Sequence, residues 1–379
     1  MSIFSKLYDL ILPHINSKDF VIPNKQKEDS FFPEYISNLL NDYIEFYETN
    51  LSVIIDTVVP FEDENGVKKE KVTLNKIKIL CKILEETVQL YYEGKSYQAS
   101  EHFTTSLNEN LINELTFSSK IIKNNLFYRA RTNNGKHFSS SDLFHIKFEH
   151  RHNVSTNRYS IPGLPALYLG STTYVCWEEF EKTKFRDLWF VKVENQKDLN
   201  VILLQRIEDF LLDIEGYNED FKLTFLLSYL VTFPLTLACT IKVKNTSGTF
   251  KPEYIIPQML LEYIVTNQTI DGIKFPSTKV NYDSLANVEA YNYVFPVKKI
   301  NKTGFCSELS NTFHLTEPSS IDLEEIISNP SSSGAVHGTG TPTDDREIEL
   351  IKDVKVKYNR TSFGKLENKL KDRKVYQVK

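Results

Sequence analysis

Arginine is the residue type whose placement says most about chemistry in this chain. The first 128 residues contain no Arg, whereas residues 129 to 158 contain four of the nine in the sequence, namely Arg129, Arg131, Arg151 and Arg158. Lysine supplies the positive charge elsewhere. A planar guanidinium group can hold a phosphate or carboxylate through two N–H groups at once. The cluster therefore predicts an anion-binding region or, in the simpler interpretation, solvated strand ends paired with local carboxylates.

Residues 158 to 179, RYSIPGLPALYLGSTTYVCWEE, place several reactive groups around one apolar strand. The chain turns at Pro162-Gly163, and PALYLG is typical of a buried strand with Tyr168 at its centre. Ser or Thr before TYVCWEEF is a helix N-cap candidate, so Glu178 and Glu179 are expected on a helix. Such a strand–turn–helix unit can direct Tyr168 and one carboxylate toward a common cleft. Core packing of the ring and a solvated helix face for the carboxylates are the alternative interpretation.

Composition excludes several classes of protein. A formal charge of −5 offers no polycationic surface for nucleic acid, and the N-terminus has no basic segment before its short apolar stretch. We expect a cytoplasmic protein with no membrane span. Four scattered cysteines indicate free thiols. Four of the eight histidines lie between residues 137 and 152, but without the spacing or supporting thiolates of a zinc site, so we expect no metal.

The elements that must position these residues fall into two regions. Apolar residues at intervals of three and four predict helices over 34–50, 75–99 and about 101–115, and hence a helical N-terminal domain over 1–120. From residue 121 the chain alternates short apolar strands (LFYRAR, PALYLG, LWFVKVE, VILLQ, ACTIKVK and DGIKF) with helices near 171–183, 218–231 and 253–268. This pattern predicts an α+β catalytic domain over 121–327 with a largely antiparallel or mixed sheet. Residues 328–345 are expected to form a flexible linker or loop, and 346–379 a strand and a basic helix that pack on the catalytic domain.

Four of these stretches, in this order, resemble the RES domain family. They are YRAR at 128–131, RYSIPGLPALYLG followed by a Glu 11 residues after Tyr168, and DGIKFPS at 271–277. EYIIPQMLLEYI and YNYVFP are also similar to the later half of longer members. The resemblance covers roughly residues 123–300. The chain departs from the short members in having Arg-Tyr-Ser where they usually have Gly-Arg-Trp.

Members of this family act as NAD-degrading toxins of bacterial toxin–antitoxin pairs, and their domain resembles the ADP-ribosyltransferase fold. The resemblance thus implies a split sheet with helices and cleavage of the nicotinamide–ribose bond of NAD, by hydrolysis or phosphorolysis. It implies catalytic roles for Arg129, Glu179 and Ser277. Spacing from Tyr168 favours Glu179 over Glu178, which we expect to look sideways or toward solvent. Substrate binding is implied for the residues Arg158, Tyr168 and Tyr128.

The resemblance also bears on cofactors and partners. NAD is the expected substrate, and no separate cofactor is expected. By analogy with short members we expect an Xre-type protein antitoxin, and we consider a homodimer. An ADP-ribosyltransferase that modifies a protein or nucleic acid, and a non-catalytic interaction protein with a RES-like fold, remain the alternative functions.

Overall fold

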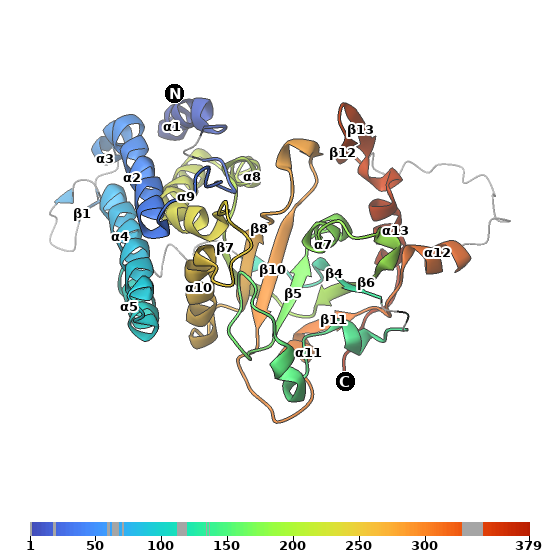
Figure 1. Ribbon diagram of the computed structural model, residues 1–379. Coiled ribbons are helices and arrows are strands. Elements are labelled where there is room, and N and C mark those ends of the chain that lie inside the picture. The colour runs from blue at the N-terminus through green and yellow to red at the C-terminus, as the bar shows by residue number, and fades with distance from the viewer. Residues whose placement is uncertain are drawn as a thin grey trace. The chain divides into compact units, whose positions relative to one another are not determined.

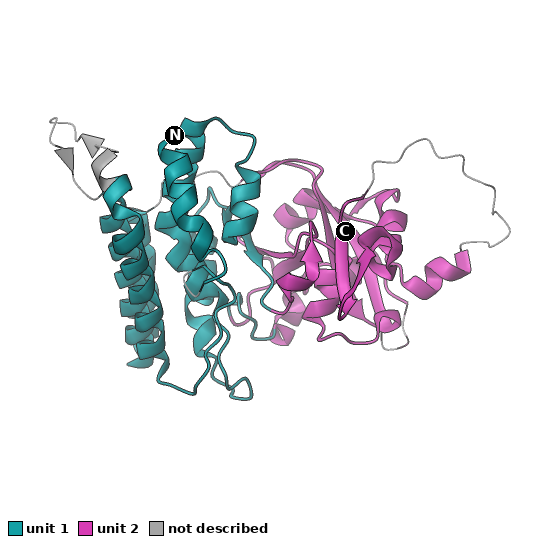
Figure 2. Cartoon of the chain, turned by 90° about the horizontal axis from the view of Figure 1, so that it is seen from above, with its two compact units in different colours: residues 1–119, 155–161, 200–278 teal, residues 120–154, 162–199, 279–379 magenta. Residues whose placement is uncertain are grey.

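The computed structural model describes residues 2–17, 20–58, 61–62, 68–69, 72–111, 120–133, 135, 137–327 and 344–379. These residues form helices and a mixed set of strands, which confirms the predicted α+β class (Figure 1). They separate into two compact units, shown in teal and magenta in Figure 2. Unit 1 comprises residues 1–119, 155–161 and 200–278, and unit 2 comprises residues 120–154, 162–199 and 279–379. Most of the predicted linker, residues 328–343, lies outside the described residues.

Unit 1 is mainly helical. Its helices are α1 (Ile3–Ile11), α2 (Phe32–Asn50), α3 (Ser52–Val58), α4 (Val72–Tyr92), α5 (Ser96–Asn110), α8 (Ile207–Asp213), α9 (Glu219–Thr240) and α10 (Ile255–Thr266). It also holds the strands β1 (Phe61–Glu62), β2 (Lys68–Lys69), β7 (Leu199–Leu203) and β8 (Gly272–Pro276). The last two are parallel, with Ile202 opposite Ile273. The helices predicted near 34–50, 75–99 and 101–115 are confirmed as α2, α4 and α5, within the described residues.

Helix α9 lies at the centre of unit 1. It packs against α1, α2, α4 and α10, and the Tyr43 hydroxyl of α2 donates to the Leu230 carbonyl at 2.9 Å. By length and composition alone α9 is apolar enough to cross a membrane, contrary to our expectation that no such stretch exists, but 67% of its most apolar part is buried inside the protein. The predicted strand ACTIKVK is also wrong, because Ala238 to Thr240 end this helix. A helix that is buried on all sides shows no periodicity in its sequence.

Unit 2 contains an antiparallel sheet in the order β14-β11-β6-β4-β5-β10. These strands are β4 (Leu126–Thr132), β5 (Ala166–Gly170), β6 (Leu188–Asn195), β10 (Tyr291–Pro296), β11 (Phe313–Leu315) and β14 (Tyr376–Gln377). β12 (Glu347–Ile351) pairs with β13 (Val354–Lys357) and β9 (Leu285–Ala286), and β3 (Lys120–Ile121) precedes the sheet in the chain. The helices are α7 (Thr173–Glu179), α11 (Ser307–Thr312), α12 (Ile321–Ile327) and α13 (Ser362–Lys371).

The compact units do not follow the predicted segments. One boundary between the units lies at residue 120, and residues 155–161 and 200–278 belong with the N-terminal helices and not with the strands of unit 2. Packing of α9 and α10 against α4 accounts for this, since it joins segments more than 100 residues apart in the chain. The predicted C-terminal strand and basic helix are present as β12 and α13.

Candidate active site in unit 2

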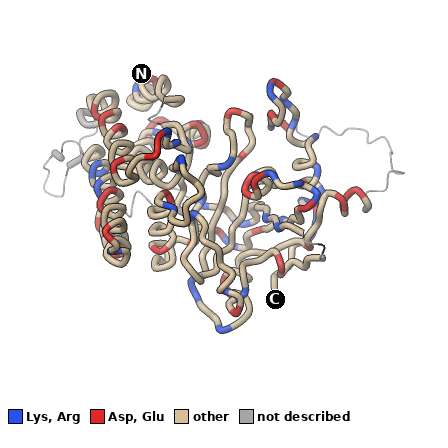
Figure 3. Tube along the Cα trace, in the orientation of Figure 1, with Lys and Arg blue, Asp and Glu red and all other residues tan. Residues whose placement is uncertain are grey.

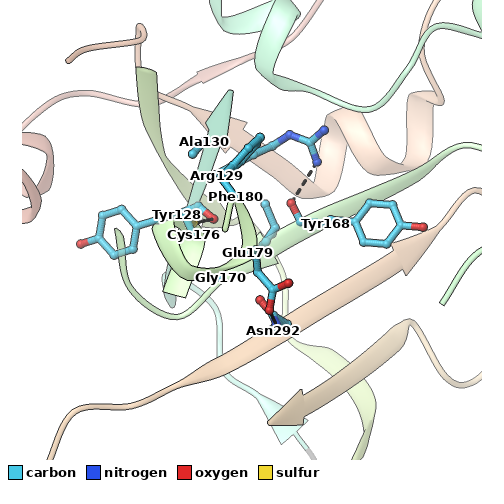
Figure 4. A pocket seen from close by; sticks show the side chains of 10 residues that line it. Tyr128, Arg129, Ala130, Tyr168, Gly170, Cys176, Glu179, Phe180 and Asn292 are labelled. Atoms are coloured by element: carbon cyan, nitrogen blue, oxygen red, sulfur yellow. Dashed lines mark hydrogen bonds between the residues drawn. The ribbon is translucent and has the colours of Figure 1, made fainter. Parts of the chain in front are cut away.

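A pocket of about 160 Å³ opens in unit 2 where β4 and β5 part. These two strands pair at one register position, Tyr128 opposite Gly170, and α7 follows directly after β5. The pocket is lined by Tyr128, Arg129, Ala130, Tyr168, Leu169, Gly170, Cys176, Glu179, Phe180 and Asn292 (Figure 4). Four of the six site residues predicted from the sequence therefore meet here: Arg129, Glu179, Tyr168 and Tyr128.

Arg129 is a half-buried cation of β4 with no carboxylate partner among the described residues. Its Nη1 donates to the Tyr168 carbonyl at 2.9 Å, and so the side chain spans the gap between β4 and β5 (Figure 4). Burial lowers the pKa of Arg129 to about 10, with a further contribution from Arg131, which still leaves it charged at neutral pH. In the described part of the chain its remaining N–H groups donate to no carboxylate, which is the property expected of an anion-binding residue.

Glu179, at the end of α7, presents a carboxylate whose orientation is held by Asn292. The Asn292 amide donates to Glu179 Oε1 at 2.6 Å, from the neighbouring strand β10. Lys279 Nζ donates to the main-chain carbonyl of Glu179 at 2.8 Å and lies 3.9 Å from its Oε2. A cation at the last carbonyl of a helix also interacts favourably with the helix dipole. The carboxylate is thus oriented but remains 35% exposed.

Glu178 lies elsewhere although it is the adjacent residue. Its side chain is 3% exposed, pairs with Lys182 Nζ at 3.4 Å, and is not among the residues that line the pocket. Of the two orientations expected for Glu178, sideways or toward solvent, the one toward solvent is wrong, because the side chain is buried. Adjacent residues of a helix point about 100° apart, so only one of the two carboxylates can face the pocket. The three-residue spacing places Cys176 on the same side as Glu179, and both line it.

Cys176 packs closely against the end of β5. Its Sγ donates to the Tyr128 carbonyl at 3.4 Å, and a Cβ atom built on Gly170 would lie 2.9 Å from that sulfur. Gly170 is therefore required for α7 to approach the strand. Burial raises the pKa of Cys176 to about 12, helped by Glu179, so the thiol is neutral at physiological pH.

The two tyrosines of the pocket have different surroundings. Tyr128 is buried in a cluster with Leu188, Phe190 and Leu366, and burial raises its pKa above the ordinary value. Tyr168 is half-buried in β5, opposite Val294 of β10. The two rings extend in opposite directions in Figure 4. Tyr168 is the less buried of the two.

Arg158 and Ser277 belong to unit 1 and are not among the residues lining this pocket. The Arg158 guanidinium donates to the main-chain carbonyls of Cys239, Ile241 and Glu253, at 3.1, 3.0 and 3.2 Å, and so holds the C-terminal end of α9. Ser277 is fully buried just after β8. The substrate roles that the resemblance implies for these two residues stay predictions.

The N-terminus of α7 is held from the C-terminal part of the chain. The buried carboxylate of Glu367, in α13, accepts from the Thr173 backbone N–H at 2.8 Å and from the Tyr358 hydroxyl at 2.6 Å. Thr172 caps the same helix by accepting from the Val175 N–H at 3.1 Å. Burial raises the pKa of Glu367. A seven-residue helix has little stability of its own, so these contacts position the residues it carries.

The histidines of this region do not form a metal centre. Within the described ranges, no group of three or more His, Cys, Asp or Glu side chains could hold a metal ion. His145 is buried, and its Nε2 accepts from the Cys306 N–H at 2.9 Å. Burial lowers the pKa of His145 to about 4, so this ring is a neutral structural group.

The sequence analysis did not identify Asn292 or Lys279 as residues of the site. Asn292 is the polar member of YNYVFP, where it stands between two buried tyrosines of β10. A polar residue inside an apolar strand signals a specific partner, because an unpaired amide is costly to bury. Lys279 carried no such signal, since it lies in a polar stretch after β8.

Comparisons with known proteins place the chain in a family. No family model matches it, and no solved structure matches it either. It is 30% identical over 347 residues to "Putative toxin YopC" of Bacillus subtilis (strain 168), in an alignment that covers 86% of this chain and 75% of that protein. Identity at this level over most of both chains means that the two share a fold and an ancestor. The chain belongs to the family of YopC.

Proposed function

We propose that this chain is a toxin-type enzyme that cleaves the nicotinamide–ribose bond of NAD. The observation that carries the proposal is the pairing, in one pocket, of a cation without a carboxylate partner among the described residues and an oriented carboxylate, Arg129 and Glu179. NAD needs both: a group that holds its pyrophosphate, and a negative charge near the ribose that becomes positive during cleavage. The name of YopC supports the toxin part, and the ordered RES-like motifs support the chemistry.

The reaction breaks the bond between the ribose C1′ and the nicotinamide nitrogen. The bonding electrons go to the ring, which is cationic before cleavage and leaves neutral, so the step needs no strong general acid. The ribose becomes an oxocarbenium-like cation, and an oxygen of water or phosphate then bonds to C1′ and loses its proton to solvent. The protein must therefore orient the substrate and stabilise positive charge.

Each pocket residue has a role in this scheme. Arg129 would hold a phosphate oxygen with the N–H groups that do not bond to Tyr168. Glu179, held by Asn292, would accept a hydrogen bond from a ribose hydroxyl and stabilise the cation. Tyr168 would contact the nicotinamide ring. A pocket of about 160 Å³ is below the usual range for drug-sized ligands, so it fits one ring-sized part of the dinucleotide, and the remainder would extend from its open mouth.

The test is an NAD-consumption assay on the full chain with products identified by mass. We expect free nicotinamide without any macromolecular acceptor, together with ADP-ribose in phosphate-free buffer, or phosphorylated ADP-ribose if phosphate is the acceptor. Expression in a bacterial host should lower cellular NAD and arrest growth. Unchanged NAD in both settings, with a folded protein, would refute the proposal.

The same assay separates the alternatives. An ADP-ribosyltransferase would consume NAD only when a protein or nucleic acid is added, and the acceptor would gain the mass of ADP-ribose. A non-catalytic interaction protein would leave NAD intact under every condition. The shape of the pocket selects the acceptor. Identification of the reaction products therefore distinguishes these alternatives, whereas the residues that hold NAD do not.

A further inference from the structure

An aromatic stripe along α9 runs from the interior of unit 1 to its surface. Phe221, Phe225, Tyr229 and Phe233 follow one another at intervals of four, so that neighbours lie on one side of the helix. Tyr229 and Phe233 are buried, and the ring of Tyr229 stacks on Phe210 of α8 with their centroids 4.2 Å apart. Phe221, at the other end of the stripe, is 56% exposed.

At the exposed end, the rings of Tyr217, Phe221 and Phe225 lie together. Tyr217 is 51% exposed, and its ring lies 5.0 Å from that of Phe225 and 6.5 Å from that of Phe221. Leu212, at the end of α8, is 63% exposed. Single exposed apolar residues are ordinary, whereas a cluster of aromatic rings at the surface marks an interaction site. We call these four residues, Leu212, Tyr217, Phe221 and Phe225, the aromatic patch.

The rim of the aromatic patch is strongly acidic. Residues 207–221 contain six carboxylates and no Lys or Arg. The flanking cations Arg206 and Lys222 pair with two of them, Glu208 and Glu219. Figure 3 marks acidic residues along α8 and the start of α9. Two of the six, Glu215 and Asp220, are exposed and have no side-chain partner among the described residues. Such unneutralised carboxylates favour a cationic partner.

We propose that the aromatic patch binds a basic amphipathic helix of a partner protein. Aromatic rings would receive the apolar side of that helix, and the carboxylates around them would face its Lys and Arg side chains. An anionic lipid surface would be repelled by the same rim. The chain's own basic helix, α13, cannot be the occupant, because its apolar residues Phe363, Leu366 and Leu370 are buried within unit 2. The proposal does not depend on NAD chemistry.

The test uses the full chain and a labelled 18-residue peptide of Leu and Lys, with Leu at helical spacing on one side. Fluorescence anisotropy should detect binding that weakens with salt, since screening reduces charge attraction. The matched peptide with Glu in place of Lys should not bind. The double variant Tyr217→Ser/Phe221→Ser should weaken binding by about tenfold or more, as expected for interface aromatics. Glu215→Gln/Asp220→Asn should weaken it and reduce its salt dependence.

A matched control is available on α5. Tyr97 is 76% exposed and Glu101 is also exposed, so Tyr97→Ser/Glu101→Gln removes one aromatic ring and one carboxylate from another surface of unit 1. This control should bind the peptide as the wild type does. If the aromatic variant unfolds, the charge variant still tests the site. The proposal is overturned if the Leu/Lys peptide does not bind, if the control variant weakens it equally, or if anionic vesicles bind in its place.

Discussion

Glu178 and Glu179 allow one experiment to test both the register of α7 and the role of its carboxylates. The change is the same in both variants, Glu to Gln, which removes a charge and keeps the shape. Glu179 lies in the pocket and is bonded to Asn292, whereas Glu178 is buried beside Lys182. We therefore expect Glu179→Gln to act on the rate of NAD turnover and Glu178→Gln to act on stability.

The structure sets the size of each effect. A single charge that stabilises a transition state contributes about 3–4 kcal/mol, so Glu179→Gln should slow turnover roughly 100- to 1000-fold. Its effect on unfolding should be small because the side chain is 35% exposed. For Glu178, the ion pair is weakened by solvent, since Lys182 is 59% exposed, and Gln can still bond to the Tyr174 hydroxyl. A cost of about 1 kcal/mol, or a Tm lower by about 2–4 °C, is expected.

The assay measures NAD consumption and thermal unfolding side by side for the wild type and both variants. A large loss of turnover in Glu178→Gln with an active Glu179→Gln would show that the catalytic carboxylate is Glu178. Equal, small kinetic effects in both would show that neither carboxylate takes part in the reaction.

Three further predictions follow from the pocket and its surroundings. Asn292→Ala removes the 2.6 Å bond to Glu179 and should lower kcat about 10- to 100-fold with little change in KM. Asn301→Ala, whose amide donates to the Phe305 carbonyl, is the control and should behave as wild type. Unchanged kcat in Asn292→Ala would contradict the orienting role. Arg129→Ala should reduce turnover about 100-fold or more. It should leave the Tm nearly unchanged, because the loss of the hydrogen bond to Tyr168 is offset by the removal of a partly buried charge. Wild-type turnover in this variant would exclude a role of Arg129 in binding an anion. Burial lowers the pKa of His145 to about 4, so the unfolded chain takes up a proton at higher pH than the folded one does. The free energy of unfolding, measured in urea, should therefore fall by about 2–3 kcal/mol as pH drops from about 6.5 toward 4. His145→Asn should reduce this dependence on pH, and an equal dependence in both proteins would contradict the buried neutral ring.

Local patterns in the sequence were sufficient for much of the fold. Intervals of three and four apolar residues located α2, α4 and α5, because a helix repeats every 3.6 residues and only one side of each faces the core. Counting 11 residues from Tyr168 placed Glu179, and not Glu178, at the pocket. The count of 11 rests on the resemblance to the RES domain family, because the strand, turn and helix alone left the choice between Glu178 and Glu179 open.

Long-range packing decided the rest. The sequence could not show that α9 continues through Ala238 to Thr240, since this end of the helix is buried on every side and carries no polar face to mark its period. It also could not show that Arg158 would donate hydrogen bonds to the carbonyls at the end of α9, or that Glu178 would be buried. Periodicity reports the geometry of a single element, whereas the partner of a side chain depends on which distant element packs against it. Asn292 meets Glu179 from a strand 113 residues away, so their contact exists only in the folded chain.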